Sequence, residues 1–327
     1  MNRNIDLQRP LMDDTTALSY WLNWRFFLCG SWVVIVIITA GILILKYEVF
    51  NTKRRHQQDD ETEPIGILYE DETWKTSLRV IHPAWLLAYR LIAFGVLLAL
   101  IISNLVIGGA RVLFFYTQWT FVLVTFYFGL ASSLSIYGCC QYWNEVVDDN
   151  MNDVGLEDSL IQVSVEPQHM SMKLSNHGDI STRKTAGIWA YSCQIVFQIC
   201  GGAVGLTDGV FWFIIYPFLA PATYKLTFLN VSLHSINVVL LLIDVILNRL
   251  RFPFFRLAYF GLWTCSFVVF QWIFHACVSM RWPYPFLDLS SSYAPIWYFG
   301  LGLIHIPVFG IFALIVKWKQ LLLSRFS

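Results

Sequence analysis

Seven long apolar stretches constrain the fold of this chain more than any other feature of its sequence. A helix needs about 20 mainly apolar residues to cross the hydrocarbon core of a bilayer, and such a helix satisfies its backbone hydrogen bonds internally. We place the stretches at residues 26–45, 84–107, 117–140, 188–216, 231–247, 255–277 and 296–316. They predict an all-α polytopic membrane bundle of about seven transmembrane helices.

The composition supports an integral membrane protein. Hydrophobic residues make up 57% of the 327 positions and charged residues 13%, whereas a soluble domain has about a quarter of its residues charged. The formal net charge is zero, which argues against nucleic acid as a partner. The cysteines form no CxxC pair and the histidines are scattered, so we expect no metal and no cofactor.

The fourth stretch leaves the number of spans open. Its continuous apolar part ends near Leu206, and Thr207, Asp208 and Gly209 interrupt it. The remainder is too short to cross a bilayer alone. We therefore favour one long kinked span, with a re-entrant bend as the alternative, and counts of six or eight spans stay open.

The distribution of Lys and Arg predicts the orientation. Fifteen lie in or beside the loops after the first, third and fifth spans and the C-terminal tail, and six lie on the other side. Because positive charge favours the cytosol, we expect the N-terminus outside or in a lumen and the C-terminus in the cytosol. Arg90 lies inside the second span, where we expect it to reach the headgroups. The plasma membrane and the endoplasmic reticulum both remain open.

The order of spans and polar segments gives the domain organisation. Both long polar loops look like flexible linkers, because they are charged and lack a hydrophobic period. The segments are an extracytosolic tail (1–25), a first transmembrane helix (26–45), a cytosolic loop (46–83), a membrane core (84–320) interrupted by a cytosolic loop (141–187), and a cytosolic tail (317–327).

A threonine and a histidine form the strongest candidate for chemistry. Thr117 begins the third span and His234 lies about a turn into the fifth, and the topology puts both in the outer leaflet. A threonine hydroxyl becomes a nucleophile when a base takes its proton, and neutral histidine suits that role. Asp208 or Asp288 can orient the ring. Asn237, at i+3 from His234, and Gln118 are candidates to support the oxyanion.

Each of these polar residues also has a structural interpretation. A threonine at the start of a helix is commonly a cap, and a single intramembrane histidine is often only bonded to a neighbouring helix. We interpret Asp244 as a structural partner of Arg90 or Arg249. His305, two residues before Pro307, is interpreted as packing in a kink region.

Four segments carry a resemblance to a known family: FYTQWTFVLVTFYFG, VFWFIIYPF, LHSINVVLLLIDVIL and WPYPFLD. In this order they resemble the androgen-induced-protein-like membrane family, and especially its rolling-stone-like branch. The resemblance covers roughly residues 84–320 and implies a core of six spans, so the first span is an addition.

The resemblance also implies a function. Two members of that family are hydrolases of fatty acid esters of hydroxy fatty acids, and their nucleophilic threonine and their histidine fall on Thr117 and His234. It implies membrane lipids and an amphiphilic ester as ligands, while protein partners are unknown. Trp119 departs from the hydrolase members, and the rolling-stone-like branch is linked to cell fusion and development. The alternative is therefore a non-enzymatic protein that acts in signalling, trafficking or cell–cell contact through its cytosolic loops.

Overall fold

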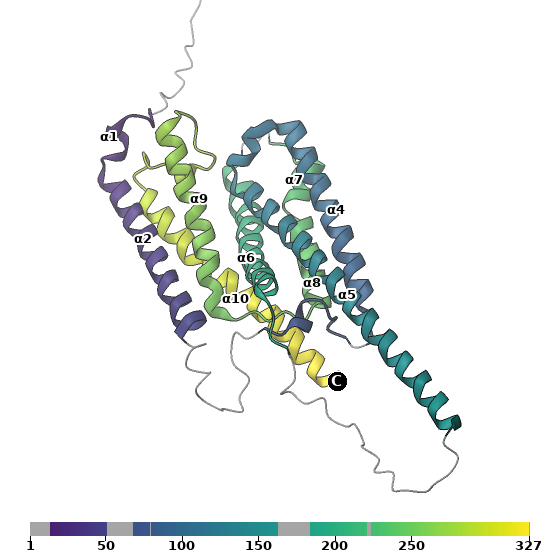
Figure 1. The fold of residues 1–327 in the computed structure, drawn as a ribbon. Coiled ribbons are helices and arrows are strands. Elements are labelled where there is room, and N and C mark those ends of the chain that lie inside the picture. Colours follow the sequence, from purple (N-terminus) through teal and green to yellow (C-terminus); the bar gives the residue numbers. More distant parts are fainter. Residues whose placement is uncertain (1–13, 51–67, 79, 163–183, 221–223, 327) are drawn as a thin grey trace, which may run out of the picture.

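The chain folds into a bundle of helices, as Figure 1 shows for the computed structural model. The structure describes residues 14–50, 68–78, 80–162, 184–220 and 224–326. Seven helices in these ranges are long and apolar enough to cross a membrane. The same ranges contain no β-strand, only two isolated bridges, Tyr69–Thr185 and Thr76–Asn248. The expected all-α polytopic fold is confirmed.

The described residues contain nine α-helices. Their bounds are α1 (Leu18–Trp21), α2 (Trp24–Ile44), α4 (Pro83–Gly108), α5 (Tyr116–Gln162), α6 (Ile188–Val210), α7 (Phe228–Leu233), α8 (Ile236–Leu247), α9 (Leu257–Cys277) and α10 (Ala294–Phe326). Short 3-10 turns cover Glu70–Thr73, Gly109–Phe114, Phe254–Arg256 and Pro285–Leu287, and π-helical turns cover Leu45–Phe50 and Phe211–Leu219.

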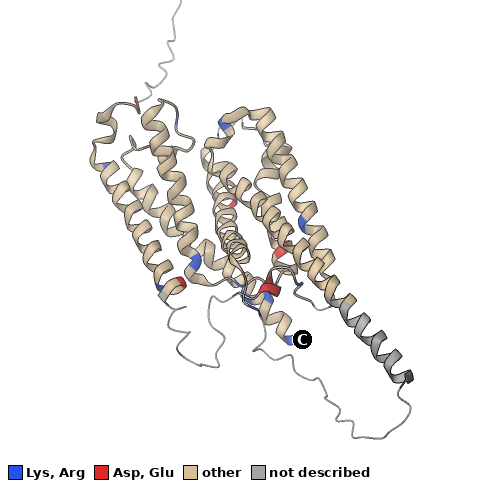
Figure 2. Ribbon diagram, in the orientation of Figure 1, with Lys and Arg blue, Asp and Glu red and all other residues tan. Residues whose placement is uncertain are grey.

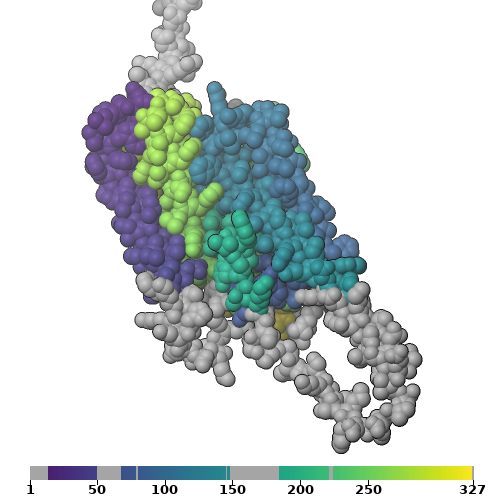
Figure 3. Space-filling view, viewed as in Figure 1, coloured from purple at the N-terminus to yellow at the C-terminus, as the bar shows by residue number. Residues whose placement is uncertain are grey.

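Helix α6 lies at the centre of the bundle. It packs against α5 and α8 on one side and against α9 and α10 on the other. Helix α2 packs on α9 and α10, and Figures 1 and 3 show α2 and α9 side by side. Close packing on α6 depends on glycine: a Cβ at Gly202 would lie 2.5 Å from the ring of Phe260.

The fourth span is one helix with a change of pitch. Helix α6 continues through Thr207, Asp208 and Gly209, and a π-helical segment (Phe211–Leu219) extends it within a single candidate span. The prediction that this stretch is one long span is confirmed. Pro217 lies inside the π-helical segment, and because proline cannot donate an i→i−4 hydrogen bond, it disfavours regular α-helix there.

The fifth span is broken, which corrects the expected position of His234 within a continuous helix. Helix α7 ends with His234 as its C-cap, and α8 starts after Ser235. Side chains satisfy the backbone groups that the break exposes. The indole Nε1 of Trp212 donates to the His234 carbonyl at 2.8 Å, and Asn237 Oδ1 accepts from the Val238 amide at 2.9 Å.

The expectation that both polar loops are flexible linkers is wrong for their described parts. Helix α5 continues beyond its candidate span, Tyr116–Asn144, to Gln162, because an established helix propagates at little cost through residues that contain no proline. Residues 68–78 dock against the helix ends, where Leu68 and Trp74 are buried. The rest of both loops, 51–67 and 163–183, lies outside the described residues.

Among the described residues, two arginines that are fully buried form ion pairs. Arg90 does not reach the headgroups as expected; its side chain is fully buried, and its Nε donates to Asp244 Oδ1 at 2.9 Å. The structural interpretation of Asp244 is thereby confirmed. Arg256, also fully buried, pairs with Glu48 at 2.8 Å and so ties the end of the first span to α9. Figure 2 shows the charged positions gathered toward the end of the bundle where α10 finishes.

Candidate functional site: a cavity inside the membrane domain

A cavity of about 740 Å³ lies between the helices. Its walls come from α2, α5, α6, α7, α9 and α10 and from the loop between α9 and α10. Most lining side chains are apolar, including Val36, Leu206 and Phe267, and a few polar side chains project among them. This size and lining are typical of a site for an apolar small molecule.

Thr117 and His234 both line this cavity. Thr117 lies in the first turn of α5 and is half-buried. Tyr284, which comes from the loop between α9 and α10, also lines the cavity. Burial raises the pKa of Tyr284 above its ordinary value of 10.0. The phenol is therefore protonated at neutral pH and can donate.

His234 is held in one orientation from two sides. Its ring stacks on Phe211, with centroids 3.6 Å apart and planes 2° from parallel. Its Nδ1 lies 3.6 Å from Asp208 Oδ1, and Asn237 Nδ2 donates to the same oxygen at 3.4 Å. The separation between Nδ1 and Asp208 is an ion-pair distance and not a hydrogen bond, and Nδ1 has no hydrogen-bond partner among the described residues. A closer approach of the carboxylate in the reacting complex would place the proton on Nδ1 and leave Nε2 as the basic atom.

Asp208 is the carboxylate that the structure brings to His234. It is 7% exposed and does not line the cavity, so the imidazole separates it from the open space. Its Oδ2 has no hydrogen-bond partner among the described residues. A buried carboxylate beside a histidine stabilises the imidazolium that forms when the ring takes a proton.

Asp288 does not take part in the site. Its Oδ1 accepts from the Tyr20 hydroxyl at 2.9 Å and from the Ser290 amide and hydroxyl at 2.9 and 2.8 Å. It therefore anchors the segment before α2 to the loop before α10. Of the two candidate carboxylates, Asp208 therefore lies beside the histidine, and Asp288 has other partners.

The two expected oxyanion-supporting residues have different positions. Gln118 lines the cavity and is 4% exposed. Asn237 does not line it, and its amide is bonded to Asp208 and to the backbone of Val238. Asn237 therefore supports the His234–Asp208 contact, whereas Gln118 is the one of the two that lines the cavity.

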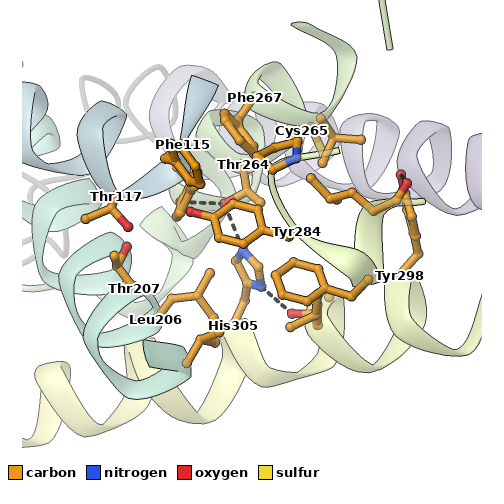
Figure 4. A pocket seen from close by; sticks show the side chains of 18 of the residues that line it. Phe115, Thr117, Leu206, Thr207, Thr264, Cys265, Phe267, Tyr284, Tyr298 and His305 are labelled. Carbon is orange, nitrogen blue, oxygen red and sulfur yellow. Dashed lines mark hydrogen bonds between the residues drawn. The ribbon is translucent and has the colours of Figure 1, made fainter. Parts of the chain in front are cut away.

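The structure adds cavity residues that the sequence analysis did not assign to a site. Tyr116, Thr264, Tyr284 and His305 all line the cavity, and Figure 4 labels the last three. His305 is not plain packing, because its Nε2 lies 2.9 Å from the Thr264 hydroxyl. No spacing in the sequence relates α9 to α10, so the one signal for this pair was an intramembrane histidine, which is costly to bury without a role.

The fold and the cavity define the class of this protein. Seven apolar helices long enough to span a bilayer make it a multi-pass integral membrane protein, here with an internal cavity that contains hydroxyl and imidazole groups. Comparison of the chain with family models, with curated proteins and with solved structures finds no significant match.

Proposed function

We propose that this protein hydrolyses an ester of a long-chain amphiphile inside its membrane domain. The observation that carries the proposal is one arrangement: Thr117 and His234 line the same apolar cavity, and Asp208 lies 3.6 Å behind the histidine. Because the lining is mainly apolar, the cavity suits acyl chains, with the ester at its polar groups.

The proposed reaction uses these groups in the roles of a hydroxyl–imidazole–carboxylate set. The Thr117 oxygen attacks the ester carbonyl carbon, and its proton passes to Nε2 of His234. The C–O bond to the alcohol breaks as that alcohol takes the proton. Water then cleaves the acyl-threonine by the same path and releases the fatty acid. Asp208 stabilises the imidazolium in both steps.

Two donors are available for the oxyanion. The phenol of Tyr284 and the side chain of Gln118 line the same cavity as Thr117. Fixed donors of this kind lower the barrier because they are already oriented when charge develops. The resemblance to the androgen-induced-protein-like family supports the same threonine and histidine, and it suggests fatty acid esters of hydroxy fatty acids as the substrate class.

The test is hydrolysis of a panel of lipid esters by purified protein in detergent micelles. Thr117→Ala and His234→Ala should each lower the rate at least 100-fold, within the range lost when a nucleophile or a general base is removed. Asp208→Asn should lower it less, because the base remains. Thr125→Ala is the matched control: Thr125 lies on the same helix, bonds to the Phe121 carbonyl at 2.9 Å and does not line the cavity.

Unchanged hydrolysis in folded Thr117→Ala and His234→Ala protein would refute the proposal. A cellular function that survives Thr117→Ala and is lost when residues 51–67 or 163–183 are deleted would instead favour the non-enzymatic alternative.

A further inference from the structure

A second hydroxyl–imidazole pair lies on the wall of the same cavity. Thr264 Oγ1 on α9 is 2.9 Å from Nε2 of His305 on α10 and 2.9 Å from the Tyr116 hydroxyl on α5. All three residues line the cavity, and Figure 4 shows the hydrogen bond between Thr264 and His305. Neither Thr117 nor His234 is part of this group.

The neighbouring atoms determine the direction of these hydrogen bonds. Nδ1 of His305 lies 2.7 Å from the Leu301 carbonyl oxygen, which can only accept, so Nδ1 carries a proton. In the neutral ring Nε2 then carries no proton, and it accepts a hydrogen bond from the Thr264 hydroxyl. A hydroxyl that donates to a bare imidazole nitrogen is in the arrangement that activates a nucleophile.

Other hydroxyls in the helices show that this arrangement is not the default. Serine and threonine in a helix commonly donate to the carbonyl four residues earlier. Thr125, Ser133, Thr207 and Ser266 do so at 2.9, 3.0, 2.7 and 2.8 Å. For Thr264 the corresponding distance, to the Phe260 carbonyl, is 3.4 Å. Its shorter contacts go to the imidazole and the phenol.

A second histidine offers a comparison for the ring. His275 on α9 also has Nδ1 near the carbonyl four residues earlier, at 2.8 Å from Gln271. Its ring stacks on Trp282, and its Nε2 has no hydrogen-bond partner in the described part of the chain. The backbone contact is thus common to both rings, whereas the hydroxyl at Nε2 distinguishes His305.

We propose that Thr264 is a nucleophile activated by His305, which acts on esters of long-chain amphiphiles that enter the cavity. The Thr264 oxygen bonds to the carbonyl carbon, and its proton passes to His305 Nε2. The C–O bond to the leaving alcohol breaks as the alcohol takes that proton, and water regenerates the hydroxyl by the reverse route. Tyr116, 2.9 Å from the Thr264 oxygen, is a donor next to the developing oxyanion.

This inference does not rest on Thr117 or His234, and one experiment separates the two sites. The full chain in detergent micelles is treated with a fluorophosphonate that carries a long alkyl chain, digested with trypsin and mapped by mass spectrometry. On attack, the oxygen–phosphorus bond forms, the phosphorus–fluorine bond breaks, and the proton passes to the imidazole. Arg256 and Arg281 flank Thr264, while Arg111 precedes Thr117, so the two threonines fall on different peptides.

We expect label on the peptide that contains Thr264. Thr264→Val should abolish that label, Thr264→Ser should keep it, and His305→Gln should slow it at least 10-fold. Ser266→Ala is the matched control on α9, since its hydroxyl bonds to a backbone carbonyl, and it should change nothing. Thr117→Ala should leave the label on Thr264.

Three results would overturn the inference: label on Thr117 alone, equal label on this peptide in Thr264→Val, or no label in protein that melts normally. If His305→Gln fails to fold, the Val and Ser variants of Thr264 still decide the outcome. Label on Thr264 without label on Thr117 would support this pair and count against Thr117 as the nucleophile of the proposed hydrolase.

Discussion

Asp244→Asn should destabilise the protein strongly, because it breaks a fully buried ion pair. Asp244 Oδ1 accepts from Arg90 Nε at 2.9 Å, and its Oδ2 accepts from Asn248 Nδ2 at 2.7 Å and from the Tyr127 hydroxyl. Arg90 also donates to Ser135 Oγ at 2.7 Å. Both charged side chains are 0% exposed, so no water can take over when the carboxylate charge is removed.

The expected magnitude follows from what the substitution leaves behind. Asparagine keeps the shape of Asp244 but leaves Arg90 as an uncompensated charge in an apolar interior, and such a loss costs about 3–5 kcal/mol. For a chain of this size that corresponds to a melting temperature lower by on the order of 10 °C. Replacing both residues, as Arg90→Met with Asp244→Leu, should cost less than Asp244→Asn alone, because no charge is then buried.

The assay is thermal unfolding of purified protein in one detergent, followed by tryptophan fluorescence. The matched control is Glu70→Gln, which breaks the pair between Glu70 and Lys184, 3.0 Å apart. The Lys184 side chain is 75% exposed, so solvent screens that pair and we expect no measurable change. A melting temperature of Asp244→Asn within about 2 °C of the parent would refute the reasoning.

Three further predictions concern packing, pH and orientation. Gly202→Ala should lower the free energy of unfolding by about 1–3 kcal/mol through overpacking, since the added Cβ lies 2.5 Å from the ring of Phe260. Gly209→Ala, whose Cβ would have no atom within 4 Å, should lower stability far less in the same melting assay. Equal losses of stability in the two variants would contradict this prediction. Burial raises the pKa of Tyr284 above its ordinary value of 10.0, so the folded state keeps that proton to higher pH than the unfolded state, and stability should fall as pH rises past 10.0. Between about pH 8 and 11, the melting temperature of Tyr284→Phe should fall less than that of the parent. An equal fall in the two proteins would count against this reasoning. An N-terminal epitope tag should bind antibody on intact cells and a C-terminal tag only after permeabilisation, because the excess of Lys and Arg lies on the same side of the membrane as the C-terminus. The reverse pattern would refute the predicted orientation.

The sequence was sufficient for the features that depend on local chain properties. Span length and hydropathy predicted seven membrane helices and the single fourth span, because each helix satisfies its own backbone and its apolar surface faces lipid. The charge of Asp244 in an apolar helix was sufficient to predict a structural ion partner, because an unpaired charge is too costly there.

Tertiary structure alone decided how the polar side chains combine. The break at His234 depends on Trp212 and Asn237, which supply hydrogen bonds that a continuous helix would have made itself. Asp208 rather than Asp288 contacts the histidine, because Asp288 is bonded to Tyr20, a residue more than 260 positions away. The Thr264–His305 contact joins two helices through a side-chain distance of 2.9 Å. Hydropathy determines that helices insert, but which of their faces meet depends on side-chain packing across the bundle, and no periodicity in the sequence encodes that.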